Sequence, residues 1–236
     1  MFSLINPSKI FGWIEKLINF INSIFFIVLS LALTFALIIS PPDYLQGDSV
    51  RIMYVHVPSA WIALAAYTCI ALLSIMRFIF KLKNLNLISK SIAPIGLLFT
   101  CLAIITGSLW GQPTWGTWWV WDARITSMFF LLIFYILFVL SNKLIKEEEK
   151  ANKVSSVIAI VGLVNIPIIK YSVDWWNTLH QPKSIDILKG TSSIHASMLA
   201  PLTLMLLVLL LYCALIFLMK YKTEIIRIKK KNIKRI

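Results

Sequence analysis

Long apolar stretches separated by short polar segments dominate the chain. Six stretches of about 16 to 23 residues contain almost no charged residue, and each is long enough to be interpreted as a membrane-spanning helix. No internal repeat divides the chain, so residues 1–236 are expected to form a single integral membrane domain. We predict an all-α, polytopic membrane protein with six transmembrane helices, which cover approximately Leu17–Ile39, Val57–Met76, Ile92–Leu109, Ile125–Leu140, Val154–Ile169 and Met198–Met219.

The composition strengthens this interpretation. Hydrophobic residues make up 59% of the chain and charged residues 14%, whereas soluble domains average about 45–50% and about 25%. A water-soluble enzyme is thereby excluded. The first apolar stretch is too long for the core of a secretory signal and lacks a small-residue cleavage site, so we expect it to be a retained helix.

The net charge of +13 is distributed unevenly between the two sides of the predicted bundle. The 23 lysines and arginines lie mostly at the N-terminus, in the short loops on the same side, and in the C-terminal tail. The positive-inside rule places that side, with both termini, in the cytoplasm. A basic tail of this kind suits the phospholipid surface and argues against a nucleic-acid role. The outer side carries only Arg51, Arg124, Lys170, Lys183 and Lys189.

Tryptophan is concentrated on the outer side. Five of the nine tryptophans fall within twelve residues of the second outer loop, predicted over residues 110–124. An aromatic belt at the headgroup level, the alternative interpretation, would spread its rings over both faces and many helices. The concentration favours an aromatic platform for a flat apolar ligand, formed by Trp110, Trp115, Trp118, Trp119 and Trp121.

All three histidines also lie on the outer side, in predicted loops or at their ends. His56 precedes Pro58 at the start of the second predicted helix, and His180 follows a Trp-Trp pair in the third outer loop. A helix N-terminus disfavours added positive charge, so His56 is expected to remain a neutral imidazole, the form that binds metals. Haem iron accepts two axial imidazoles, and its porphyrin suits a desolvated aromatic surface. The sequence thus indicates haem ligation by His56 and His180, with ordinary hydrogen bonding to backbone or water as the alternative; His195 is interpreted as a residue at the start of the sixth helix.

Two outer arginines are candidates for the haem propionates. Arg51 and Arg124 each lie close in sequence to a predicted haem element, and the planar guanidinium suits carboxylates. A structural ion pair of Arg124 with Asp122 or Asp48 is an equally compatible interpretation. For Asp122, hydrogen bonding to indole N–H groups or backbone amides is favoured over an acid–base role.

Several other kinds of site find no support. The chain contains no Walker A loop, HExxH or CxxCH motif, and no ionisable pair in the middle of a predicted span. The lack of intramembrane charge argues against a pump or secondary transporter. The three cysteines lie in apolar spans without CxxC spacing, so we interpret Cys69, Cys101 and Cys213 as small buried hydrophobes.

The segment WGQPTWGTWWVWDAR over residues 110–124 resembles the tryptophan-rich WWD signature of haem-handling proteins in cytochrome c biogenesis. The segments VHVPSAW around His56 and WWNTLHQ around His180 resemble the histidine motifs of one branch, the haem exporter protein C (CcmC) family, whose six-span length also fits. The resemblance covers nearly the whole chain. Met128 departs from it, because many relatives carry an acidic residue there, and His195 is not part of the family pattern.

The resemblance implies a function in haem delivery. Proteins of this family bind haem b at the periplasmic face of the bacterial inner membrane, with axial ligands that correspond to His56 and His180. They present it to the chaperone CcmE, whose own histidine becomes attached to a haem vinyl group. An ABC transporter of CcmA and CcmB, with the small protein CcmD, then releases the loaded chaperone for c-type cytochrome maturation.

The resemblance implies an assembly factor more than an enzyme, because the reactive groups belong to haem and to the partner. Two other function classes stay open from the residues alone. A b-type cytochrome that exchanges electrons with quinone would usually hold its haem at mid-span, whereas these histidines lie at outer ends. A permease for a flat apolar solute would use the tryptophans as a gate and the histidines structurally.

Overall fold

The computed structural model describes residues 7–82, 85–181, 184–186 and 190–233. Lys183 and Lys189, which we predicted on the outer side, lie outside these residues. Within the described ranges the chain is almost entirely helical. Its α-helices are α1 (Pro7–Thr34), α2 (Met53–Phe80), α3 (Leu85–Trp115), α4 (Ala123–Leu144), α5 (Glu148–Leu163), α6 (Asn165–Trp175) and α7 (Ala196–Ile233).

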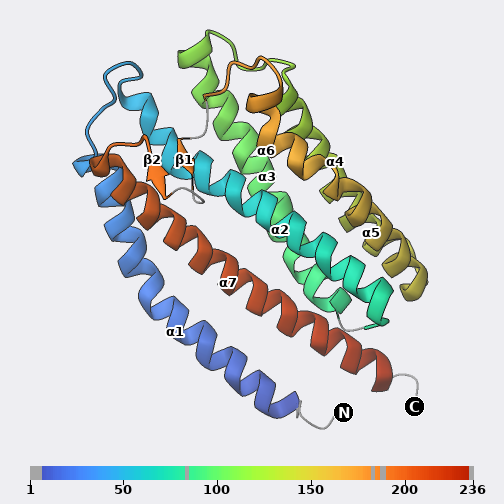
Figure 1. Ribbon diagram of the computed structural model, residues 1–236. Helices are drawn as coiled ribbons and strands as arrows, with labels where there is room; N and C mark the ends of the chain where they lie inside the picture. Colours follow the sequence, from blue (N-terminus) through green and yellow to red (C-terminus); the bar gives the residue numbers. More distant parts are fainter. Residues whose placement is uncertain (1–6, 83–84, 182–183, 187–189, 234–236) are drawn as a thin grey trace.

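Shorter elements complete the fold. A π-helical turn, Phe35–Ile39, extends α1, and a 3-10 turn, Asp48–Ile52, leads into α2. Strands β1 (Ile185–Asp186) and β2 (Thr191–Ser192) form a small antiparallel hairpin before α7. The helices run side by side, and the N- and C-termini lie at the same end of the bundle (Figure 1). We call the opposite end, which carries the β-hairpin, the loop end.

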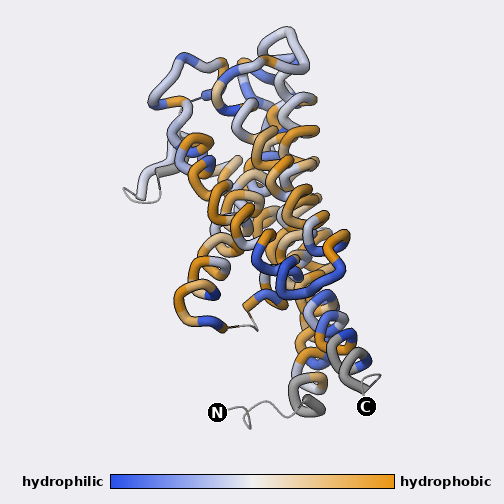
Figure 2. Tube along the Cα trace, turned by 90° about the vertical axis from the view of Figure 1, so that its right-hand side faces the viewer, coloured by the Kyte–Doolittle hydropathy of each residue, from blue (hydrophilic) through white to orange (hydrophobic). Residues whose placement is uncertain are grey.

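The predicted number of spans is confirmed. Among the described residues, six helical stretches are long and apolar enough to cross a membrane, and hydrophobic residues occupy the middle of the bundle while polar residues gather toward its ends (Figure 2). The chain is thus a multi-pass membrane protein. The stretches are Phe11–Ile39, Asp48–Phe80, Leu85–Trp115, Ala123–Leu144, Glu148–Trp175 and Ala196–Arg227.

Helices α2 and α3 extend further toward the loop end than the sequence predicted. Helix α2 begins at Met53, so His56 lies in its first turn and not in a loop. Helix α3 continues through Pro113 to Trp115 and ends at Gly116, whose φ of 76° is a left-handed conformation that favours glycine. The amide of Gly116 donates to the carbonyl of Gln112 at 3.0 Å. The first part of the predicted tryptophan loop is therefore helical.

The fifth span consists of two helices. Helix α5 ends at Leu163 and α6 begins at Asn165. Pro167 has no N–H to donate to the carbonyl of Leu163, which accounts for the break. The buried Asn165 side chain donates from Nδ2 to the carbonyl of Ser127 on α4 at 2.8 Å. This hydrogen bond holds the start of α6 against α4.

Two buried tyrosines connect the helices at mid-membrane. Tyr135 on α4 donates to the carbonyl of Ala63 on α2 at 2.7 Å, and Tyr67 on α2 donates to the carbonyl of Ile158 on α5 at 3.0 Å. Their ring centroids lie 5.0 Å apart in an edge-to-face arrangement. Small residues let helices approach closely in a bilayer, where interhelical hydrogen bonds add modest stability. Here the tyrosine rings occupy the space left by missing side chains at Gly96 and Gly162.

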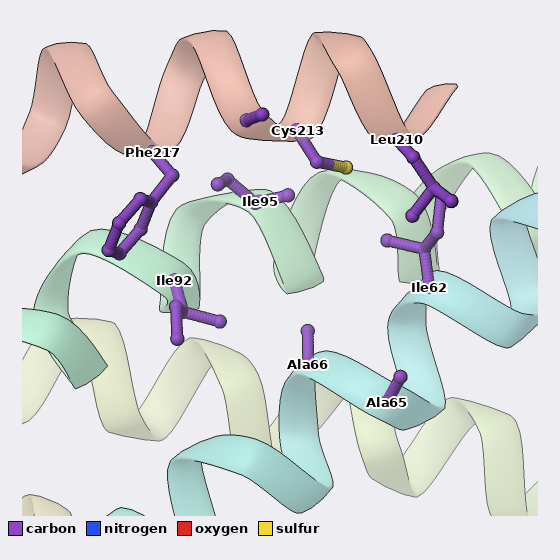
Figure 3. A pocket seen from close by; sticks show the side chains of 9 residues that line it. Ile62, Ala65, Ala66, Ile92, Ile95, Leu210, Cys213 and Phe217 are labelled. Carbon is purple, nitrogen blue, oxygen red and sulfur yellow. The ribbon is translucent and has the colours of Figure 1, made fainter. Parts of the chain in front are cut away.

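Helix α7 covers α2 and α3 incompletely. Between the three helices runs a groove of about 340 Å³ lined by apolar side chains (Figure 3). We call it the apolar groove. Its lining residues are Ile62, Ala65 and Ala66 of α2, Ile92 and Ile95 of α3, and Leu210, Cys213, Ala214 and Phe217 of α7.

Replacing Gly96 with alanine tests the tyrosine packing. A Cβ at Gly96 would collide with the ring of Tyr135, so Gly96→Ala is expected to destabilise the protein by about 1–3 kcal/mol. Gly12→Ala is the matched control, because among the described residues no atom outside its chain neighbours and its own helix backbone lies within 4 Å of the corresponding Cβ position in α1. Thermal unfolding in detergent measures both variants. Equal melting temperatures for the two would contradict the packing argument.

Candidate functional site

A large cavity lies toward the loop end of the bundle. Its volume is about 730 Å³, within the range of about 300–1,000 Å³ typical of small-molecule sites. Helices α2, α3, α4, α6 and α7 and the loops that join them contribute to its lining, which is mostly apolar. We call it the site cavity. His56 and His180 both line it, although they come from segments far apart in the sequence.

His56 is held from behind by α3. Its Nδ1 lies 3.0 Å from the carbonyl oxygen of Ala103 and 3.1 Å from Oγ1 of Thr106. A carbonyl oxygen only accepts, so Nδ1 carries the proton and Nε2 of a neutral ring keeps its lone pair. The ring also packs closely on Gly107, where a Cβ would lie 2.9 Å from Cε1 of His56. Nε2 has no hydrogen-bond partner among the described residues and is the atom available to a metal.

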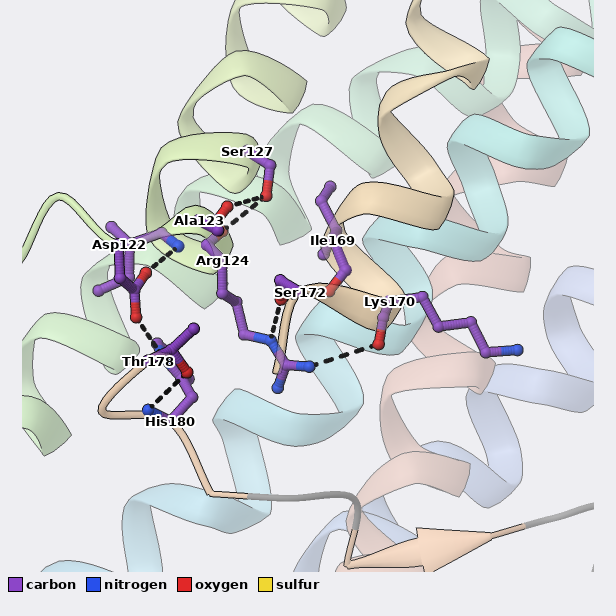
Figure 4. Close-up of polar contacts among 10 residues, drawn as sticks. Asp122, Ala123, Arg124, Ser127, Ile169, Lys170, Ser172, Thr178 and His180 are labelled. Atoms are coloured by element: carbon purple, nitrogen blue, oxygen red, sulfur yellow. Dashed lines mark hydrogen bonds and ion pairs between the residues drawn. The ribbon is translucent and has the colours of Figure 1, made fainter. Parts of the chain in front are cut away.

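His180 is held by a carboxylate. Its Nδ1 donates to Oδ2 of Asp122 at 3.2 Å (Figure 4). Its ring meets Trp115 edge-to-face with centroids 4.8 Å apart. Hydrogen bonding of this kind fixes the tautomer and orientation of metal-binding histidines. Both imidazoles therefore contribute to the cavity while their Nδ1 atoms are occupied by other groups.

Asp122 has two tasks in this arrangement. Its Oδ1 accepts a hydrogen bond from the amide of Ile125 at 2.7 Å, which caps the N-terminus of α4, while Oδ2 accepts from His180. Burial raises the pKa of the Asp122 carboxyl, but the hydrogen bonds from His180 and Ile125 outweigh burial and leave the pKa below its usual value. The carboxylate form is thus the one these contacts favour. The hydrogen bond from the backbone amide of Ile125 agrees with the structural role that the sequence favoured for Asp122.

The tryptophans divide into two groups. Trp110, Trp115 and Trp119 line the site cavity, whereas Trp118 and Trp121 are 57% and 70% exposed and do not. The ring of Trp110 lies edge-to-face with His56, with centroids 5.8 Å apart. Nε1 of Trp119 is buried and has no hydrogen-bond partner in the described part of the chain. A buried indole N–H usually finds a partner, so this donor suits an acceptor on a ligand.

The two outer arginines differ in position. Arg124 lines the site cavity and donates from Nε to Oγ of Ser172 at 3.1 Å (Figure 4). Arg51 does not line it: its Nε is paired with Asp48 at 3.0 Å, and its Nη1 donates to the carbonyl of Ala36 at 2.8 Å. Asp48, which the sequence offered as a partner of Arg124, is thus paired with Arg51, and of the two arginines only Arg124 lines the cavity.

Several cavity residues were missed by the sequence argument. Gln46 lies beside the platform, where its Oε1 accepts from Nε1 of Trp110 at 3.0 Å. Trp61, Lys170 and Met128 also line the cavity, and the carbonyl of Lys170 accepts from Nη2 of Arg124 at 3.5 Å while its side chain extends away from Arg124 (Figure 4). The outer location of Gln46, Trp61 and Lys170 was the only available signal in the sequence. His195, in contrast, is exposed and its Nδ1 lies 2.8 Å from Oγ of Ser197.

The donor set fits a metal that brings its own equatorial ligands. No group of three or more His, Cys, Asp or Glu side chains that could hold a bare metal ion occurs among the residues the structure describes. Two imidazoles in an apolar, indole-lined cavity are instead suited to a metal macrocycle, because haem iron needs only axial ligands from the protein. The cavity volume, the unpaired Trp119 N–H and the cations Arg124 and Lys170 fit such a ligand with acidic substituents.

Comparison with known proteins also points to haem. The chain matches the family described as Heme exporter protein C over residues 1–235. It is 36% identical over 227 residues to Heme exporter protein C of Bradyrhizobium diazoefficiens, which covers 96% of this chain and 86% of that protein. It is 39% identical over 193 residues to Heme exporter protein C of Escherichia coli (strain K12), with 82% and 77% covered.

A eukaryotic relative is similar over a shorter range. The chain is 44% identical over 175 residues to the "Putative cytochrome c biosynthesis ccmC-like mitochondrial protein" of Marchantia polymorpha, which covers 74% of this chain and 73% of that protein. The family match thus extends over nearly the whole chain, and its relatives are bacterial and mitochondrial. On this basis, the chain belongs to the Heme exporter protein C family.

Proposed function

We propose that the chain binds haem b in the site cavity and delivers it to the haem chaperone CcmE for the maturation of c-type cytochromes. The observation that carries the proposal is the presence of His56 and His180 in one indole-lined cavity, each with Nδ1 already bonded to another group. The names of the relatives describe a haem exporter, and the geometry supplies two axial nitrogens for the iron.

In this proposal the chain holds and orients its cargo. Nε2 of His56 and of His180 bind the iron, and Trp110, Trp115 and Trp119 contact the apolar ring. Arg124 and Lys170 serve the propionates, and the Trp119 N–H supplies a further donor. Arg51 is better assigned to the anchoring of α2, because its hydrogen bonds with Asp48 and Ala36 occupy it.

The exposed tryptophans suit contact with a partner. Trp118 and Trp121 extend from the same loop that lines the cavity, and aromatic side chains are enriched in protein interfaces. We assign them to the docking of CcmE, whose histidine becomes joined to a haem vinyl group. The chain then contributes by holding cargo and partner together, which replaces a random encounter by a positioned one.

The wider assembly follows from the family. We propose that the chain acts beside the ABC transporter subunits CcmA and CcmB and the small protein CcmD in the bacterial inner membrane. The loop end then faces the periplasm and both termini face the cytoplasm, because the lysines and arginines gather at the end that carries the termini.

Substitution of the two histidines tests the ligand assignment. His56→Ala and His180→Ala are each expected to weaken haem binding by more than about tenfold and to abolish the low-spin absorption spectrum, because one axial nitrogen is lost. His195→Ala is the control and is expected to keep the wild-type spectrum, since His195 lies outside the cavity. Thermal unfolding of the haem-free proteins shows whether each variant folds. Wild-type spectra for both cavity variants would refute the assignment.

Paired tryptophan variants separate the platform from the docking surface. Trp115→Ala with Trp119→Ala is expected to reduce haem retention, since both rings line the cavity. Trp118→Ala with Trp121→Ala is expected to retain haem but to slow its transfer to purified CcmE, since both rings are exposed. Absorption spectra measure retention, and covalent haem on CcmE measures transfer. The division would be wrong if both pairs lost retention equally.

A reporter fused after Ile236 tests the orientation. Green fluorescent protein at this position is expected to fluoresce, and alkaline phosphatase to be inactive, because both outcomes require a cytoplasmic C-terminus. The reverse pattern would invert the topology and place the site cavity on the cytoplasmic side.

A further inference from the structure

The apolar groove adjoins the site cavity. Ile62 and Ala65 of α2 and Leu210 of α7 line both of them. The side chain of Leu210 is 47% exposed and Ala65 is also exposed, so the junction of the two spaces opens to the flank of the bundle. Ala65 is the thirteenth residue of the 28-residue helix α2, about 18 Å along it from Met53. This opening therefore lies within the span and not at the loop end.

We infer that this opening is a lateral portal through which haem passes from the hydrocarbon of the bilayer into the site cavity. The inference rests on the proposed haem function and adds the route by which the cargo arrives. The portal consists of Ala65 and Leu210, and the apolar groove below it provides the surface along which the apolar edge of the ring moves (Figure 3).

The chemistry of the groove favours a porphyrin body over its carboxylates. Its lining is apolar throughout, with the Cys213 thiol as the nearest approach to a polar group. An ionised propionate in this groove would have no partner, and a charge inside the membrane is costly without one. Arg124 and Lys170 line the site cavity and do not line the groove.

The positions of the apolar and cationic lining residues determine which path of haem entry costs the least free energy. Haem in the outer leaflet keeps its propionates at the headgroup level and its ring in the hydrocarbon. A sideways movement between α2 and α7 then brings the propionates toward Arg124 and Lys170 and the ring toward His56, and no carboxylate crosses apolar surface. Passage along the groove from the termini end would instead drag both carboxylates past Phe217, Ile92 and Ile95.

The small side chains of the groove provide the test. Ala66→Trp on α2 and Ala214→Trp on α7 each fill the groove without altering a residue that lines the site cavity. Ala200→Trp is the matched control, because Ala200 is exposed on α7 and lines neither space. Haem-free protein is reconstituted in liposomes whose lipid already contains haem, and excess apo-albumin outside traps any haem that enters water. The rate at which the low-spin spectrum appears is then recorded.

Wild-type protein and Ala200→Trp are expected to take up haem despite the albumin. Ala66→Trp and Ala214→Trp are expected to do so at least about tenfold more slowly, a rise of about 1.4 kcal/mol in the barrier, while reaching the same final spectrum when haem is added in detergent. Ala66→Leu and Ala214→Leu fill less space and are expected to give intermediate rates. The Leu variants decide the question if either Trp variant fails to bind haem in detergent.

Three results would overturn the portal. Albumin could abolish uptake by the wild-type protein, which would mean an aqueous route. The groove variants could take up haem at the wild-type rate. Mass spectrometry could find a phospholipid bound to the wild-type protein and lost from the variants without any change in uptake, which would make the groove a lipid site. If the wild-type protein acquires no low-spin spectrum even with excess haem in detergent, the proposed function fails, and not only the route.

Discussion

The close packing of α2 on α3 is the constraint on which the site cavity depends. A polar ring in a bilayer needs a partner for each donor, and α3 supplies one at the carbonyl of Ala103. The approach is possible because Gly107 has no side chain where the ring of His56 lies. Once Nδ1 is bonded in this way, Nε2 is left for the cavity, and the space between the helices acquires a ligand position. A bulkier residue at 107 would displace the imidazole.

The number and class of the helices could be predicted from the sequence, but their ends could not. Uncharged apolar runs of this length are typical of membrane helices, so the six spans follow from hydropathy alone. The ends depend on single residues. Pro113 looks like a helix terminator, yet α3 continues past it until Gly116 adopts a positive φ. Pro167 lies within an apolar run that predicts one continuous helix, although its missing N–H divides the fifth span.

The site residues of rare type, histidine and tryptophan, could be predicted because they gather in the outer segments of the sequence. The residues whose position depends on tertiary contacts could not. The histidines and tryptophans concentrate on one side of the predicted bundle, and the structure brings His56, His180 and three of the five tryptophans together. Nothing in the sequence distinguishes Arg51 from Arg124, because the contact of Arg51 with the carbonyl of Ala36 arises only when the first and second spans pack. Lys170 could not be predicted because its place in the cavity follows from the course of α6.

The mid-membrane tyrosines have a mechanical consequence. His56 is held between α2 and α3, whereas His180 lies in the loop after α6 and is bonded to Asp122 at the start of α4. Hydrogen bonds of Asn165 and Arg124 join α6 to α4. Tyr67 and Tyr135 fasten these two halves deep in the bundle. A rotation of one half against the other about these tyrosines would change the distance between the two imidazoles more than the distance between the tyrosines, because the imidazoles lie farther from the axis. In the haem function proposed above, such a rotation would weaken the hold on the iron without unfolding any helix.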